Sequence, residues 1–267
     1  MSFLTPSSHE TSTVTTATFA DLDTDAVNAY IEARLRRLPT HIQPADIAVR
    51  LGLVVASGPR QTPTVCALYL FGVAPQWFLP QLTLGCVRIA GLTLTDPVVA
   101  RADLEGPLPS LVTRATQFVS EYTLGSSQTM PKQDSNRSEY DPALLQEVLV
   151  NALVHRDLRS PGRTLLRLFD DRLEVWNPGG FPQPIDDVEH FAEEGGISLP
   201  RNPFVALGAQ TLGLGEQLGR GLPKIHHAVR DLAATGPIFR VSKEDVCVTL
   251  PSGLSLLSGP GRVAFQN

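Results

Sequence analysis

The stretch from residue 141 to residue 157, DPALLQEVLVNALVHRD, decides the fold of the second half of the chain. Asp141 and Pro142 are a strong helix start, because an Asp side chain caps free backbone N–H groups and proline suits the first helical position. Apolar residues then recur at helical spacing. The sequence therefore predicts one helix that runs to about Asp157.

Polar residues interrupt the apolar surface of this helix. At 100° per residue, Glu147, Asn151 and His155 fall within an arc of about 80°. The residues that border this arc are apolar: Leu144, Val148, Val150 and Val154. Leaving a buried polar group without a partner costs about 1–3 kcal/mol. We therefore expect something polar to meet Glu147 and Asn151.

Two interpretations of the Glu147–Asn151 pair stay open on this evidence. In the first, both side chains form hydrogen bonds with the protein's own loops. In the second, the carbonyl oxygen of Asn151 binds Mg²⁺, and Glu147 orients or deprotonates a water molecule beside it. Hard cations prefer oxygen ligands, and a base one helical turn away can reach such a water.

A polar segment from residue 125 to residue 138 marks a change in composition, since Met130 is its only large apolar residue. It predicts the following organisation: a disordered, Ser/Thr-rich tail over 1–18, an α+β region over 19–124, a linker over 125–139, a second domain over 140–252 and a tail over 253–267.

Apolar spacing and turn residues predict the elements on either side of the linker. Before it we expect helices over 25–38, from Pro44 to Gly52 and over 108–122, and a strand over 82–90; residues 65–72 fit a helix or a strand. After it we expect a hairpin over 164–169 and 172–177, a short helix over 188–193, a glycine-rich loop over 213–221, a helix over 223–232, and a last hairpin over 238–242 and 246–250.

Bulk composition excludes several classes of protein. With 42% hydrophobic and 18% charged residues, the chain has a normal soluble balance. Its net charge of −5 argues against a strongly basic nucleic-acid-binding surface overall but does not exclude a local patch. Three cysteines without a CxxC pair favour a reducing cytoplasm. No apolar run reaches membrane-spanning length, so we expect no membrane partner.

Residues 147–157, EVLVNALVHRD, resemble the N-box of the GHKL ATPases (gyrase, Hsp90, histidine kinase, MutL). More closely, the chain resembles the ATPase-like C-terminal domain of bacterial RecG-related or AlbA-type (Schlafen AlbA_2-associated) transcriptional regulators. Four motifs of that family occur in order over about residues 140–252: Asn151–Asp157, Asp170–Gly180, Arg201–Pro203 and Leu218–Gly221. The resemblance implies a Bergerat-type α/β sandwich with a mixed, largely antiparallel sheet.

The resemblance also implies an ATP site that uses Mg²⁺. Glu147 would be the general base and Asn151 the Mg²⁺ ligand. Asn177 and Gly179 would contact adenine in place of the usual Asp-x-Gly-x-Gly box, although Asn177 brings no charge and Gly180 stands one position too early for the second glycine. Expected phosphate contacts are Gly219, Arg220, Gly221 and Lys224, at the N-terminal end of a helix.

Three functions remain as hypotheses. The first is an ATP-binding domain of a cytoplasmic regulator, with slow or no hydrolysis. The second is a nucleotide-free module for interaction or homodimerisation. The third is a DNA-binding regulator without ATP turnover, in which DNA would be contacted through flanking modules that this chain does not show. A motor helicase is not supported, since the GxxxxGK[ST] loop is missing. A protein-kinase loop is not supported either, because Gly162 stands where the pattern after His155 needs Asn.

Overall fold

The computed structural model describes residues 9–36, 44–58, 60–124, 139–181, 188–194, 200–215, 221–232 and 238–252. Gly219 and Arg220, two of the predicted phosphate contacts, lie outside these ranges, as do most of the predicted linker and the whole C-terminal tail. Within the described ranges, no helix has both the length and the apolar character needed to cross a membrane.

A six-stranded mixed sheet organises the molecule. Its strand order is β4-β3-β5-β6-β8-β7. Neighbouring strands are antiparallel except for β3 and β5, which run parallel. This result confirms the predicted α+β class and the mixed, largely antiparallel sheet. The strands are β3 (Leu84–Ile89), β4 (Val98–Leu104), β5 (Thr164–Leu168), β6 (Arg172–Pro178), β7 (Ile238–Val241) and β8 (Asp245–Pro251).

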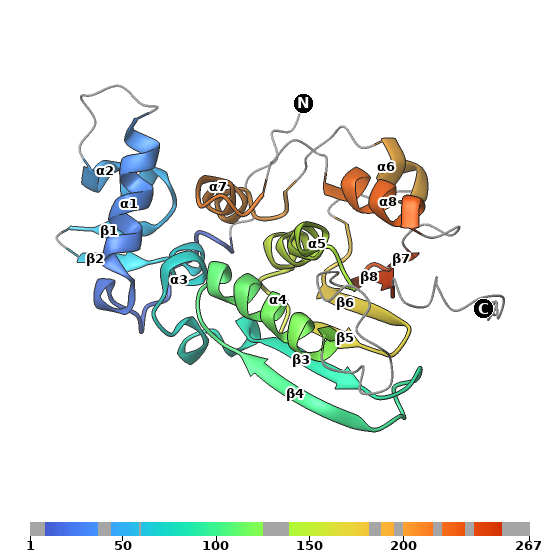
Figure 1. Ribbon diagram of the computed structural model, residues 1–267. Coiled ribbons are helices and arrows are strands. Elements are labelled where there is room, and N and C mark those ends of the chain that lie inside the picture. The colour runs from blue at the N-terminus through green and yellow to red at the C-terminus, as the bar shows by residue number, and fades with distance from the viewer. Residues whose placement is uncertain are drawn as a thin grey trace.

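Helices cover one face of this sheet (Figure 1). Helix α5 (Pro142–His155) packs on β6, and α4 (Leu108–Leu124) packs on β3 and β4. Helices α6 (Val188–Glu194) and α8 (Gly221–Leu232) pack on each other beside them. Strand residues that point to this side, such as Leu166, Leu173 and Val175, are buried in the core. Alternation along β5 and β6 therefore separates a core face from an open face.

The N-terminal half adds a smaller unit beside the sheet (Figure 1). It contains α1 (Thr24–Leu35), α2 (Pro44–Arg50), a hairpin of β1 (Val54–Ser57) and β2 (Arg60–Pro63), and the fully buried α3 (Val65–Phe71). Helix α7 (Pro203–Thr211) packs against α3 and α5. Gly208 allows this approach, because an added Cβ there would lie 2.2 Å from Leu70 Cδ1.

Several observations differ from the predicted organisation. Residues 9–18 were expected in a disordered tail, but Ala17 is buried and the Glu10 side chain reaches the first turn of α7. Residues 65–71 form a helix, which resolves the open choice. Strand β4, the β1–β2 hairpin and α7 were not predicted. Because β4 pairs with β3 and β3 pairs with β5, the sheet joins residues from both sides of the predicted linker.

Candidate functional site

Glu147 and Asn151 contact each other one turn apart on α5. The Nδ2 group of Asn151 donates to the backbone oxygen of Glu147 at 2.8 Å and to Glu147 Oε1 at 3.0 Å. Both residues are partly buried. With Nδ2 used in this way, the Asn151 oxygen Oδ1 is left to accept from, or bind to, something else.

Gly221, the first residue of α8, lies directly over this pair. A Cβ atom built on Gly221 would stand 2.7 Å from both Glu147 Oε1 and Asn151 Nδ2, and 3.0 Å from Asn151 Oδ1. A side chain at this position would therefore force the ends of the Glu147 and Asn151 side chains to shift. Glycine brings the backbone at the N-terminal end of a 12-residue helix onto a carboxylate and an amide. The free N–H groups of such an end attract anions.

The donor atoms of this pair suit Mg²⁺. Asn151 Oδ1 and the Glu147 carboxylate are hard oxygen ligands, and Mg²⁺ is usually held by one or two protein oxygens together with phosphates and water. Within the described ranges, no group of three or more His, Cys, Asp and Glu side chains is placed to hold a metal ion.

The predicted adenine side lies at the end of β6. Asn177 is buried, with 6% of its surface exposed, and points to the helix-covered face like Val175. Its Oδ1 accepts a hydrogen bond from Thr164 Oγ1 at 3.3 Å. The oxygen that would accept from an adenine amino group therefore already has a partner within the sheet.

Gly179 and Gly180 pack tightly against the turn between β7 and β8. Gly179 has φ +95°, a value that favours glycine, and its N–H donates to the Glu244 oxygen at 2.6 Å. The Gly180 N–H donates to the Lys243 oxygen at 3.4 Å. An added Cβ on Gly180 would collide with the Ser242 backbone. These contacts explain both glycines without a ligand.

Arg201 joins this glycine turn to the end of α5. Its Nη2 group donates to the Gly180 oxygen, and its Nη1 lies 3.6 Å from Asp157 Oδ2. Burial and the nearby Arg201 charge lower the pKa of His155 to about 4, so His155 is neutral at pH 7. The sequence pattern did not assign Arg201 a role, although it lies in the Arg201–Pro203 motif.

The structure thus places the predicted residues in two groups. Glu147, Asn151 and Gly221 are brought together between α5 and α8, and Asn177, Gly179 and Gly180 lie together at the end of β6. Asn151 stands four residues before His155, the last residue of α5, a rise of about 6 Å, and Asp157, just after the helix, contacts the Gly179 turn. A ligand that touches both groups must extend along the last part of α5. Lys224 is exposed on α8.

Comparisons with known proteins support the fold of this region. Residues 163–250 match a family model, HATPase_c_4, which is described as "Putative ATP-dependent DNA helicase recG C-terminal". The matched segment begins after α5, so it includes Asn177 and Gly221 but not Glu147 or Asn151. No curated protein matches the chain in sequence at a significant level.

A solved structure, that of the DIP2311 protein from Corynebacterium diphtheriae, has a similar fold. The TM-score is 0.62 at 20% sequence identity, over 92% of this chain and 47% of that one. This chain therefore spans about half the length of the protein it resembles. At this identity the similarity is one of fold.

Proposed function

We propose that this protein binds ATP together with Mg²⁺ between α5 and α8, in a Bergerat-type domain of the GHKL class. The observation that carries the proposal is the Glu147–Asn151 pair beneath Gly221. Here two side-chain oxygen atoms that can bind a metal ion meet the N-terminal end of a helix. The HATPase-like match over residues 163–250 supports the same class of ligand.

In this proposal each residue has a distinct role. Asn151 Oδ1 would hold Mg²⁺, whose charge would offset that of the phosphates. Glu147 would orient the attacking water, and the backbone of Gly221 would face the phosphates. Gly219, Arg220 and Lys224 are the proposed further phosphate contacts. Asn177, Gly179 and Gly180 would line the adenine end.

Two contacts favour binding with little or no hydrolysis. One oxygen of the Glu147 carboxylate already accepts from Asn151 Nδ2, so this contact must be given up or shared before that oxygen can orient a water molecule. The Asn177 oxygen is engaged by Thr164, so adenine must displace that bond or make a weaker contact. Binding therefore rests on firmer contacts than turnover does.

Isothermal titration of the full chain with ATP and MgCl₂ tests this proposal. We expect binding that depends on Mg²⁺ and is weakened about 10–100-fold by Asn151→Ala, because a contact to a charged group contributes about 1.5–3 kcal/mol. Unchanged affinity in the variant would contradict the role of Asn151. Absence of heat with the wild-type protein would contradict ATP binding itself.

A glycine pair provides a matched control for the geometry. Gly221→Ala would place a methyl group 2.7 Å from the Glu147 and Asn151 side chains, so we expect it to abolish Mg-ATP binding. Gly215→Ala adds the same methyl group nearby, where it meets only Val150 Cγ1 at 3.4 Å. Titration of both variants should show loss in the first and near wild-type affinity in the second. Equal affinities would argue against a ligand under Gly221.

The hydrogen bonds at the predicted adenine end favour a second candidate function, that of a nucleotide-free interaction module. The Asn177 oxygen and the N–H groups of Gly179 and Gly180 are all bonded within the protein. If the titration shows no binding, this second function becomes the better account of the fold.

A further inference from the structure

The face of the sheet opposite the helices carries charged side chains along several of its strands. Helices α4, α5, α6 and α8 lie on the other face, and within the described part of the chain no helix covers this one (Figure 1). We call it the open face. Strand pairing aligns one row of side chains across five strands: Arg101, Val87, Arg167, Glu174 and Thr249.

Arginines outnumber acids on the open face. Five arginines project there, Arg101, Arg163, Arg167, Arg172 and Arg240, against three acids, Asp103, Glu174 and Asp245. The chain as a whole has a net charge of −5, so this face has the opposite sign. With Asp171, which pairs with Arg172 from the adjoining turn, the arginines exceed the acids by one, so the face carries a small positive surplus.

Each of two carboxylates is shared between two guanidinium groups. Asp103 lies 2.8 Å from Arg163 and 3.3 Å from Arg101, whose side chains are 42% and 63% exposed. Glu174 lies 2.8 Å from Arg172 and 3.8 Å from Arg167. Arg172 has a second acid, Asp171, in the adjoining turn. Sharing holds the guanidinium groups in place without neutralising all of them.

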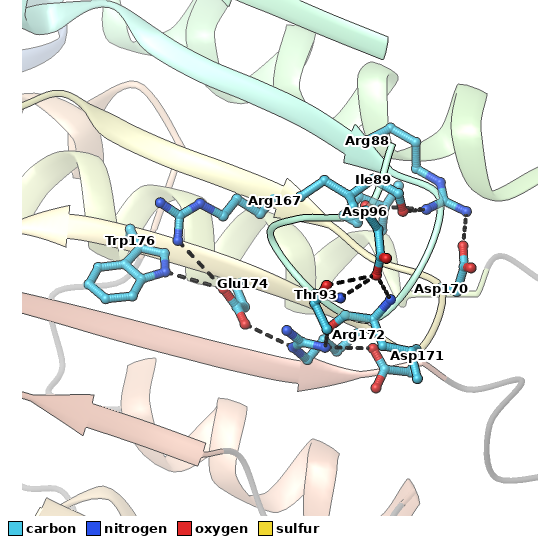
Figure 2. Close-up of polar contacts among 12 residues, drawn as sticks. Arg88, Ile89, Thr93, Asp96, Arg167, Asp170, Asp171, Arg172, Glu174 and Trp176 are labelled. Atoms are coloured by element: carbon cyan, nitrogen blue, oxygen red, sulfur yellow. Dashed lines mark hydrogen bonds and ion pairs between the residues drawn. The ribbon is translucent and has the colours of Figure 1, made fainter. Parts of the chain in front are cut away.

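An indole ring lies among these arginines. The Cζ atoms of Arg240 and Arg167 lie 4.1 and 5.1 Å from the Trp176 ring centroid. The Trp176 Nε1 group donates to Glu174 Oε2 at 3.3 Å, which fixes the ring on the strand (Figure 2). The open face thus carries one indole ring with two guanidinium groups over it.

We propose that the open face binds single-stranded nucleic acid. Surplus guanidinium charge matches a phosphate backbone, and unpaired bases stack on aromatic rings and on guanidinium planes. The six strands span about 24 Å at their usual spacing, so several nucleotides can cross the face. In a duplex the base faces are already stacked, so a duplex would contact only the charged side chains. An acidic protein would likewise make no stacking contact at Trp176.

Tryptophan fluorescence provides the test. The chain has two tryptophans, and Trp77 is exposed on a separate turn, so Trp77→Phe leaves Trp176 as the sole reporter. Oligothymidylate of about 20 nucleotides should quench it at low salt and bind at least tenfold more tightly than a duplex of the same length. Arg101→Gln with Arg240→Gln should weaken binding about tenfold and flatten the log K against log [salt] slope by about 1.4.

Arg50 on α2 provides a matched control that lies away from the open face. Arg50→Gln removes an exposed arginine and should leave oligothymidylate binding unchanged. Equal binding of the duplex, tighter binding of polyglutamate, or equal losses in the Arg50 variant would overturn the proposal, as would no quenching at low salt. Competition by excess Mg-ATP would place the oligonucleotide between α5 and α8 and would also overturn it.

Discussion

At the scale of single residues, the Glu10 carboxyl group makes the stability of the protein depend on pH. Glu10 is fully buried, and its Oε2 accepts from the N–H groups of Phe204 and Val205, each at 3.1 Å. Burial raises the pKa of Glu10 to about 7 from a usual 4.5, although the two N–H groups favour the charged form. The pKa of Glu10 is thus higher in the folded protein than in the unfolded chain. The stability that the uncharged Glu10 group provides is therefore complete below pH about 4.5 and is lost as pH rises through about 7.

Glu10→Gln removes this titration and keeps an oxygen that accepts from both N–H groups. We expect the variant to gain on the order of 2–3 kcal/mol relative to wild type between pH 5 and pH 8. Urea unfolding of both proteins at each pH measures it, and pH 5, where Glu10 is uncharged, serves as the internal reference. Parallel curves for the two proteins would show that Glu10 stays charged in the folded state.

At the scale of elements, Asn202 connects two helices. It precedes α7, but its Nδ2 donates to the Val154 and Arg156 oxygens at the end of α5, at 2.8 and 2.9 Å. Asn202→Ala would leave these buried oxygens unpaired and should cost about 2 kcal/mol or more in the free energy of unfolding. Asn28→Ala on the exposed face of α1 should change it by less than about 0.5 kcal/mol. Similar urea midpoints for the two variants would show that the two Asn202 hydrogen bonds do not stabilise the folded protein.

The sequence predicted those elements that carry strong local signals. Asp141 and Pro142 marked the start of α5, and Asp170 marked the turn between β5 and β6. Strand β4 was missed because VVARADL mixes β-branched residues with Ala, Arg and Asp, which are weak strand formers. Helix α7 was missed because Gly208 lowers its helix propensity, and the reason for that glycine is its contact with Leu70.

The same limit applies to the candidate site. Helical periodicity alone put Glu147 and Asn151 on one face of α5. No local pattern could show that Gly221, some 70 residues later, lies on them, or that Thr164 bonds to Asn177, because both contacts depend on how helices and strands meet. The roles proposed for the site residues stay predictions until ligand binding is measured.

At the scale of the whole molecule, the sheet couples the two halves of the chain. Strand β3 pairs with β5 across the segment that the sequence predicts as a linker, so we expect residues before and after it to unfold in one cooperative transition. Mg-ATP at 100 times its Kd should stabilise the folded state by about 2.7 kcal/mol and raise that single melting temperature by roughly 5–10 °C. Calorimetry with and without Mg-ATP measures both effects, and the Gly221→Ala protein should show the transition without the rise. Two transitions, of which only one moves with nucleotide, would mean that residues 140–252 fold independently and that the β3–β5 pairing does not link the halves energetically.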